Sequence, residues 1–295
     1  MAKMTKNHFQ IADISINIDT WCELPPHGWL EKFCAGGEQK NNADILVSVD
    51  IGTLPSKDGL ECVFESPKMR VYNDKESTYR FYTDGMESEF GEYACTRYAF
   101  NEYGRYFSTV HKDKADAVPT MKYVLDILPI DTMMTAYERV ILHSSYIVHN
   151  GGAVLFTGPS GMGKSTQAML WQQHVGAEII NGDRAVLGKN EHGQWMAYGL
   201  PYCGSSKICE NVTVPVRAIV VLKQSKENTL VRLSHSAAFR SIYSELTVSK
   251  WDMVCMNRAI DTAMGIACEV PVYLLSCVKD ISAVELLKKE IERAK

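Results

Sequence analysis

Three observations predict an α/β fold for this chain of 295 residues. The first 130 residues favour strands, strand and helix patterns alternate from residue 131 onward, and a glycine-rich loop separates an apolar run from a helical pattern near the middle. Strands that alternate with helices are typical of a mixed sheet covered by helices. We therefore expect an antiparallel β-rich region over residues 1–130 and an α/β domain over residues 131–295, with no low-complexity linker.

The strand prediction for the N-terminal region follows from period-two alternation and turn residues. Ile14, Ile16 and Ile18 alternate with polar residues, as in a half-buried strand. Residues 69–85 and 93–110 each read as two strands around a polar or glycine turn. Tyrosine is dense here, which favours packing across strands, although such a stripe also serves as a stacking platform for bases in other proteins.

The second region contains apolar residues at helical spacing in some segments and at strand spacing in others. Residues 131–145 begin with an aspartate suited to helix capping and show helical spacing, and residues 146–158 read as a strand hairpin around Asn150. Further helices are expected over residues 163–174, 236–246 and 280–294, and further strands over 177–182, 217–224 and 270–277.

Composition excludes several classes of protein. The formal net charge is −4 and no run of Lys or Arg exceeds two residues, so neither nucleic acid nor an acidic membrane is an expected partner. No apolar segment approaches the ~20 residues of a membrane span, and no signal peptide is recognised. Nine cysteines without C-x-x-C spacing argue against a disulfide framework. A reduced, cytoplasmic protein is expected.

The strongest motif lies in the middle of the chain and has the pattern G-x-x-x-x-G-K-[ST]. It consists of Gly158, Pro159, Ser160, Gly161, Met162, Gly163, Lys164, Ser165 and Thr166. Glycines let successive backbone N–H groups point at phosphate oxygens, and the helix that follows adds the positive end of its dipole. Lysine then reaches the outer phosphates, and the serine hydroxyl coordinates Mg²⁺. The sequence thus predicts a nucleotide-phosphate site.

The surroundings of this motif resemble the HPr serine kinase/phosphorylase family. The resemblance covers about residues 137–190, with His143 fifteen residues before Gly158 and Asp183-Arg184 beginning nineteen residues after Lys164. It implies the P-loop fold shared with ATP-dependent phosphoenolpyruvate carboxykinase, with ATP and Mg²⁺ as cofactors. It also implies a serine hydroxyl as phosphoryl acceptor and a homo-oligomeric assembly.

The chain departs from that family in three respects. Gly182 stands where the family has the first residue of an acidic pair, the signature of phosphorolysis is missing, and no HPr-docking segment is recognised. The chain therefore resembles more closely the short HPr-kinase-like proteins of peptide-modification clusters, some of which phosphorylate serine on a peptide.

Candidate catalytic residues follow from position and from the resemblance. Asp183 ends a buried strand pattern and is expected to bind Mg²⁺ or to act as general base, although an aspartate there also serves as a turn residue. The resemblance implies that His143 lies near the acceptor, where a purely structural histidine is the alternative. It also implies Glu210 as a second metal ligand, in addition to Ser165.

Two basic residues are candidates for substrate contacts. Arg184 would stabilise the transferring charge or pair with Glu178 on the surface, where a pair contributes little. Lys207 closes the polar loop 198–207 and would reach a phosphate, unless that loop is an ordinary turn. Cys203, in the same loop, has no activating partner in the sequence.

These observations predict an ATP- and Mg²⁺-dependent kinase acting on a serine hydroxyl in a peptide, a protein or free serine. The alternative is a nucleotide-binding regulatory or partner-binding protein without phosphotransfer, because one acidic residue is replaced by Gly182. A carboxykinase acting on oxaloacetate is disfavoured by the short chain. The choice of ATP over GTP comes from the resemblance alone.

Overall fold

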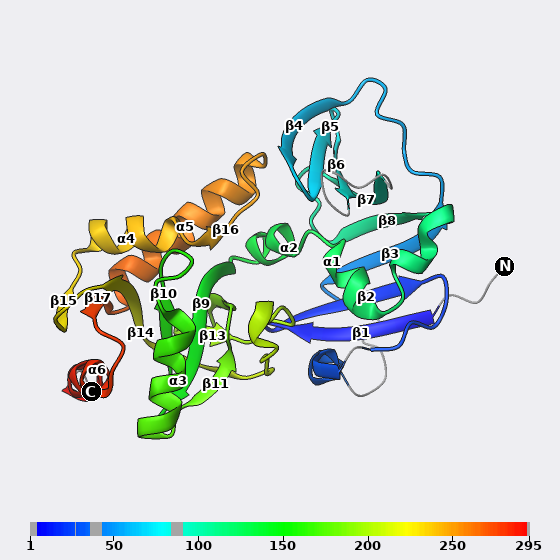
Figure 1. Cartoon of the computed structure of the whole chain (residues 1–295). Coiled ribbons are helices and arrows are strands. Elements are labelled where there is room, and N and C mark those ends of the chain that lie inside the picture. The colour runs from blue at the N-terminus through cyan, green and yellow to red at the C-terminus, as the bar shows by residue number, and fades with distance from the viewer. Residues whose placement is uncertain (1–4, 27, 36–42, 84–90, 294–295) are drawn as a thin grey trace. The chain divides into compact units, whose positions relative to one another are not determined.

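The computed structural model describes residues 5–26, 28–35, 43–83 and 91–293 (Figure 1). The chain forms two compact units, each with its own sheet. The first comprises Met1–Met133 with Trp251–Val254, and the second comprises Met134–Lys250 with Cys255–Lys295. No helix among the described residues is long and apolar enough to cross a membrane.

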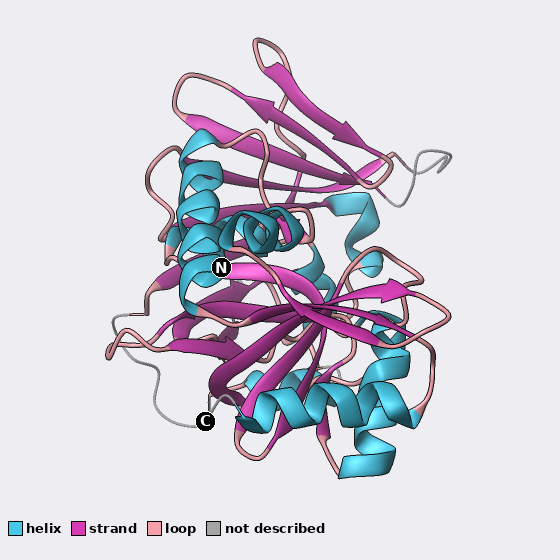
Figure 2. Ribbon diagram, turned by 90° about the vertical axis from the view of Figure 1, so that its left-hand side faces the viewer, coloured by secondary structure: helices cyan, strands magenta, loops and turns pink. Residues whose placement is uncertain are grey.

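The first unit contains one eight-stranded sheet in the order β1-β2-β3-β8-β7-β6-β5-β4. Figure 2 distinguishes strands from helices by colour. The strands of the first unit are β1 (Thr5–Ile11), β2 (Ile14–Thr20), β3 (Ile45–Gly52), β4 (Glu61–Ser66), β5 (Met69–Asn73), β6 (Ser77–Thr83), β7 (Glu92–Ala99) and β8 (Arg105–His111). Its short helices are η1 (Gly28–Phe33), η2 (Lys112–Ala117) and α1 (Met121–Asp126), and α2 (Ile130–Ala136) begins within it.

The prediction of a wholly antiparallel N-terminal region is wrong. Strand β3 runs parallel to both β2 and β8, so the sheet is mixed. Parallel neighbours need a long crossover, and the 24 residues from 21 to 44, which include η1, supply it. The hairpins predicted over 69–85 and 93–110 are confirmed within the described residues as β5–β6 and β7–β8.

The core of the first unit comes from the alternating strands. Ile14, Ile16 and Ile18 of β2 are all at most 3% exposed, as the period predicted. Tyr98 and Tyr106 are buried with ring centroids 5.4 Å apart. These two tyrosines therefore serve packing rather than a surface for stacking bases.

The second unit contains nine strands and most of the longer helices. The strands are β9 (Val140–His149), β10 (Gly152–Thr157), β11 (Glu178–Asn181), β12 (Arg184–Lys189), β13 (Trp195–Tyr198), β14 (Thr213–Gln224), β15 (Thr229–Arg232), β16 (Leu246–Thr247) and β17 (Val272–Cys277). The helices are α3 (Lys164–Val175), η3 (Gly204–Ser206), α4 (His235–Tyr243), α5 (Met253–Glu269) and α6 (Ile281–Arg293), although the first two residues of α5 are counted in the first unit.

Two long strands organise this sheet. The first half of β9 pairs with β12 and β16, and its second half pairs with β10 and β11. Strand β14 likewise pairs with β13 near its start and lies parallel to β10 and β17 farther along. The parallel strands β10, β14 and β17 therefore bring their carboxyl ends to one edge, where ligands of open α/β sheets bind.

The helix predicted over 131–145 is partly wrong. Helix α2 ends at Ala136, Glu138 adopts a positive φ of 57°, and β9 begins at Val140. The run from Val140 to Leu142 is fully buried between β12 and β16, so long-range pairing prevails over helical spacing. The other elements predicted for this region are present: α3, α4, α6 and strands β10, β11, β14 and β17.

Candidate phosphate-binding site

The glycine-rich loop leaves the buried strand β10 and leads directly into α3. Gly158, Gly161 and Gly163 have φ values of 135°, 82° and 104°, a region that residues with a Cβ rarely adopt. Gly163 is the N-cap of α3 and provides no side-chain cap, and the first turn carries no acidic residue. The N–H groups of this turn and the positive end of the helix dipole are therefore available to an anion.

Lys164 folds back across the loop. Its side chain is buried, and its Nζ donates hydrogen bonds to the carbonyl oxygens of Gly158 at 2.7 Å and Pro159 at 3.2 Å. Burial lowers the pKa of this ammonium below its ordinary value, and the nearby carboxylates Glu245 and Asp183 partly oppose that shift. A polyanion in the loop would restore the stabilisation that water otherwise gives the charge.

A buried asparagine builds the turn that carries Asp183. The Asn181 side chain is fully buried, and its Oδ1 accepts hydrogen bonds from the backbone N–H groups of Asp183 at 2.9 Å and Arg184 at 3.0 Å. Its Nδ2 donates to the carbonyl oxygens of Leu200 at 2.9 Å and Tyr202 at 3.0 Å. Asn181 thus fixes the end of β11, the start of β12 and the loop before η3.

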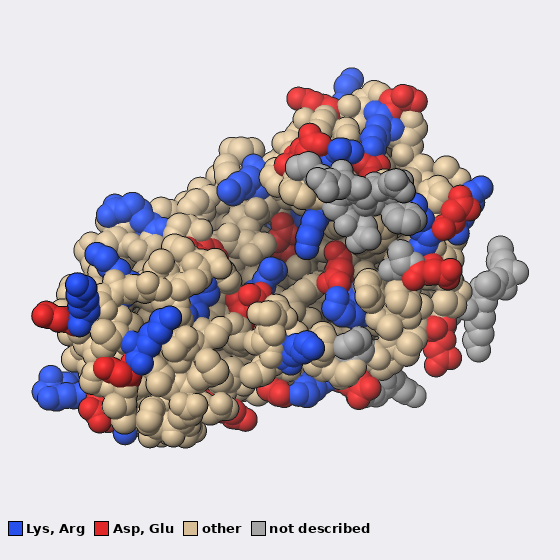
Figure 3. Space-filling model, viewed as in Figure 1, with Lys and Arg blue, Asp and Glu red and all other residues tan. Residues whose placement is uncertain are grey.

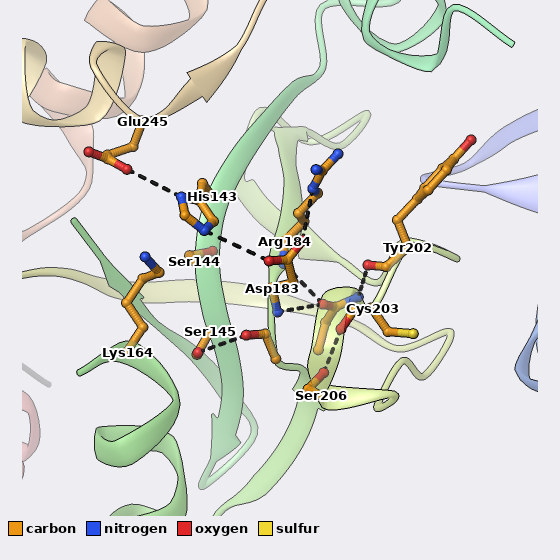
Figure 4. A network of polar contacts seen from close by, with 12 residues as sticks. His143, Ser144, Ser145, Lys164, Asp183, Arg184, Tyr202, Cys203, Ser206 and Glu245 are labelled. Atoms are coloured by element: carbon orange, nitrogen blue, oxygen red, sulfur yellow. Dashed lines mark hydrogen bonds and ion pairs between the residues drawn. The ribbon is translucent and has the colours of Figure 1, made fainter. Parts of the chain in front are cut away.

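Asp183 and His143 face each other across neighbouring strands, and a second carboxylate stands behind the imidazole (Figure 4). His143 Nε2 lies 3.8 Å from Asp183 Oδ1, and His143 Nδ1 lies 3.4 Å from Glu245 Oε2. Asp183, His143 and Glu245 thus form a row, and a backbone hydrogen bond also supports it, because the N–H of His143 donates to the carbonyl oxygen of Glu245 at 3.0 Å. The row of two carboxylates and one imidazole can hold or relay a proton.

Gly182 leaves no room for a side chain. A Cβ at this position would collide with the Cβ and Oγ of Ser206 in η3, and Ser145 Oγ donates a hydrogen bond to the Gly182 carbonyl at 3.1 Å. A Cβ on Gly204 would lie 2.7 Å from the Cγ of Asp183. The η3 segment therefore closes over this turn, and Asp183 is the single carboxylate of the Gly182-Asp183 pair.

The loop and the turn line one pocket of about 310 Å³. Its lining residues are His143, Ser160, Gly161, Gly163, Lys164, Ser165, Thr166, Gly182, Asp183, Ser205, Ser206 and Lys279. The structure therefore brings the predicted Asp183, His143, Lys164 and Ser165 together. The remaining loop residues Gly158, Pro159 and Met162 lie outside this lining, although the first two accept the Lys164 hydrogen bonds.

Beyond the loop, three further predicted site residues are not part of this lining. Glu210 donates its backbone N–H to Ile180 at 2.8 Å, and Lys207 is an exposed residue at the end of η3. Arg184 donates from Nε to Asp183 Oδ2 at 3.0 Å, which orients that carboxylate.

Sequence reasoning missed Lys279 and Glu245. Lys279 follows β17, and its Cε would lie 4.0 Å from a Cβ on Gly163. A lysine just after a late buried strand is a signal that could have found it, because parallel strands end at one edge. Glu245 is placed by the pairing of β16 with β9, which has no local signature.

Fold and site together define a mixed α/β protein in which a glycine-rich loop at a helix N-terminus faces a histidine and an aspartate. The chain belongs to the family described as SynChlorMet cassette protein ScmC, whose family model matches residues 107–293. No curated protein matches the chain.

Among solved structures, the chain is similar to the Hpr(Ser) kinase/phosphatase from Coxiella burnetii. The two are 14% identical, the match covers 52% of this chain and 94% of the other, and the TM-score is 0.29.

Proposed function

We propose that the protein is an ATP- and Mg²⁺-dependent kinase that transfers the γ-phosphoryl group to a serine hydroxyl, and that its second unit has the carboxykinase-type P-loop fold. The observation that carries the proposal is the shared pocket, which places an uncapped helix N-terminus and a buried lysine opposite Asp183 and His143. Phosphoryl transfer requires mainly charge neutralisation, positioning and a group that takes the acceptor's proton. The pocket offers residues for each of these tasks.

The loop would hold the phosphates. Its glycines allow backbone N–H groups to face a polyanion, and Lys164 would exchange the carbonyls of Gly158 and Pro159 for phosphate oxygens. Lys279 borders the same pocket and would add a second positive charge. Figure 3 shows acidic and basic residues intermixed on the visible face, and we assign recognition of the nucleotide to this local cradle.

The oxygen donors fit magnesium that arrives with a nucleotide. The pocket contains the Ser165 hydroxyl and the Asp183 carboxylate, and no group of three or more His, Cys, Asp or Glu side chains suited to a metal occurs among the described residues. Mg²⁺ in phosphotransferases is held by one or two protein oxygens together with phosphates and water. Bound there, it would neutralise charge on the phosphates.

The proton of the acceptor hydroxyl would pass to the row of Asp183 and His143. Glu245 holds the far side of the imidazole, and Arg184 fixes the second oxygen of Asp183, so the Oδ1 atom remains directed toward His143. We assign the general-base role to Asp183 and a positioning role to His143. A serine in a peptide is the acceptor class that we propose.

The test follows transfer of labelled γ-phosphate from ATP to serine-containing peptides and to free serine. Asp183→Asn should lower kcat by roughly 10²- to 10⁴-fold, as expected for loss of a general base. His143→Ala should also lower kcat and alter the dependence of kcat on pH. The control Asp261→Asn changes an exposed residue on α5 and should leave both kcat and its pH dependence unchanged. Failure of the unmodified protein to label any acceptor while it binds ATP tightly would contradict the kinase proposal.

The second candidate is a nucleotide-dependent binding protein without transfer. The closed space at Gly182 favours it, because only one carboxylate is available at the turn. In that case nucleotide would promote partner binding equally in the unmodified protein and in Asp183→Asn.

A further inference from the structure

A second pocket adjoins the first. It has a volume of about 310 Å³ and shares Gly163 and Lys279 with the first pocket, which the glycine-rich loop lines. The first pocket is lined by Lys164, Ser165 and Thr166 at the start of α3. The second is lined by Gln167, which lies four residues after Gly163 and therefore on the same side of the helix. A ligand with phosphates in the first pocket therefore has an adjacent space for the rest of its structure.

The chemistry of this second pocket differs from that of the first. Its borders include the apolar or soft side chains Met162, Cys277 and Val278, with two glutamines, Gln167 and Gln224, and no carboxylate. Apolar side chains next to a few amides suit a heterocyclic base.

Gln167 has an unfilled hydrogen-bonding site. Its side chain is 2% exposed, and its Nε2 donates to Cys277 Sγ at 3.5 Å. No described group donates to its Oε1, which is a costly arrangement for a buried amide. Rotation of the terminal amide would present its carbonyl and its NH₂ to a base, and a glutamine amide matches the donor–acceptor pair of adenine with two hydrogen bonds.

The loop itself is attached to this pocket. Gln224, at the end of β14, donates from Nε2 to the carbonyl of Gly161 at 3.0 Å. This bond fixes the distance between the phosphate cradle and the second pocket, as recognition of one extended ligand requires.

We propose that the second pocket binds the base of the nucleotide and that Gln167 selects adenine over guanine. This inference rests on the proposed function, since it concerns the nucleotide whose phosphates the loop would hold. It assigns base selection to Gln167 and phosphate binding to the loop and to the three helix residues that precede Gln167.

The test measures dissociation constants of ATP, GTP and inorganic tripolyphosphate, each with Mg²⁺, by calorimetry. The unmodified protein should prefer ATP, and Gln167→Leu should weaken ATP binding by roughly ten- to a hundredfold, as for one bidentate contact. Affinity for tripolyphosphate should not change. Gln167→Glu, which keeps the shape but loses the NH₂ donor, should lose part of the preference. The matched control is Gln172→Leu, on the exposed face of the same helix.

The outcomes separate the two proposals. An unchanged ratio of ATP to GTP affinity in both Gln167 variants, or no preference in the unmodified protein, would overturn the assignment of the base and leave phosphate binding intact. If the unmodified protein binds neither nucleotide nor tripolyphosphate, the proposed function itself is wrong.

Discussion

Lys164 is a buried ammonium whose two hydrogen-bond acceptors are backbone carbonyls of its own loop. Carbonyl dipoles compensate a full charge less well than water or an anion does, which is why burial lowers the pKa of this residue. The folded protein therefore bears an energetic cost at Lys164, the residue to which the proposed function assigns phosphate binding, and functional sites commonly carry such costs.

This cost predicts a pH-dependent effect of Lys164→Met. Because the pKa is lower in the folded state, the unfolded chain binds the proton more tightly, and folding becomes more favourable as pH rises through the lowered pKa toward ~10.4. At neutral pH the variant should thus be more stable than the unmodified protein, and the difference should shrink in alkaline solution. Urea unfolding at several pH values measures this.

The same variant should lose stabilisation by nucleotide. A ligand at a hundredfold excess over its dissociation constant stabilises the folded state by ~2.7 kcal/mol, which Lys164→Met should largely abolish. Lys289→Met, an exposed substitution on α6, serves as control and should change stability by less than about 0.5 kcal/mol. If Lys164→Met is less stable than the unmodified protein at neutral pH, and nucleotide still raises its unfolding free energy, Lys164 is neither a destabilising charge nor a phosphate ligand.

Sequence reasoning identified the loop residues because their geometry is local. Positive φ at Gly158, Gly161 and Gly163 and the following helix are encoded within a few positions. Glu245 reaches His143 through the pairing of β16 with β9, far along the chain, and this pairing leaves no short pattern to recognise. Lys279 follows the late buried strand β17, a weaker signal that depends on where parallel strands end. The placement of Glu245 could be learned only from the fold.

At the level of elements, the site depends on the contact between the turn after β11 and η3. Gly182 and Ser206 pack so closely that neither a methyl group nor a carboxylate fits at residue 182. Ser206 is itself held there, since its Oγ donates to the Cys203 carbonyl at 2.6 Å. The position of Asp183 is thus coupled to that of η3.

We predict that Gly182→Ala displaces η3 and disturbs Asp183. Overpacking of this kind costs about 1–3 kcal/mol of stability, and the transfer rate should fall with it. The double variant Gly182→Ala/Ser206→Gly removes the colliding atoms and should recover much of both losses. Chemical denaturation and the labelled-phosphate assay measure the two effects, and a double variant no better than the single one would refute the coupling.

The helix predicted over 131–145 illustrates the limit of periodicity at this scale. Met134, Tyr137 and Ile141 have helical spacing, yet Ile141 belongs to β9. The segment Val140–Leu142 is buried against strands from two other parts of the chain, and that burial outweighs the weak helical preference. Period alone cannot distinguish a helix from a short buried strand.

Across the whole molecule, the sequence predicts the kinds of structure better than their pairing. The spacing of apolar and polar residues predicts the strand-rich first part and the alternating strands and helices of the second part. The parallel arrangement of β2, β3 and β8 depends on a crossover that no local pattern specifies. Helix α5 and strands β12 and β13 were not predicted, although they complete the core around Ala197 and Ala263. Small residues and short strands carry weak periodic signals.

The first unit contains a buried ion pair far apart in sequence. Arg80 on β6 is 3% exposed, and its Nη1 lies 2.7 Å from Asp131 Oδ1 at the start of α2. Its guanidinium also lies 4.9 Å from the ring centre of Trp251. Removal of one member of such a pair leaves an uncompensated charge away from water.

We therefore expect Asp131→Ala to cost about 3–5 kcal/mol of unfolding free energy, because Arg80 cannot be solvated where it stands. Glu65→Ala removes an exposed carboxylate 2.7 Å from Arg70 on the same sheet and should cost at most about 1 kcal/mol. The double variant Arg80→Met/Asp131→Leu, which removes both charges, should be more stable than Asp131→Ala alone. Hydrogen exchange of the β6 amides in urea isolates the first unit in all three variants. Equal costs for Asp131→Ala and Glu65→Ala would show that the pair contributes no more than a surface contact, and α2 would then be held by its apolar packing.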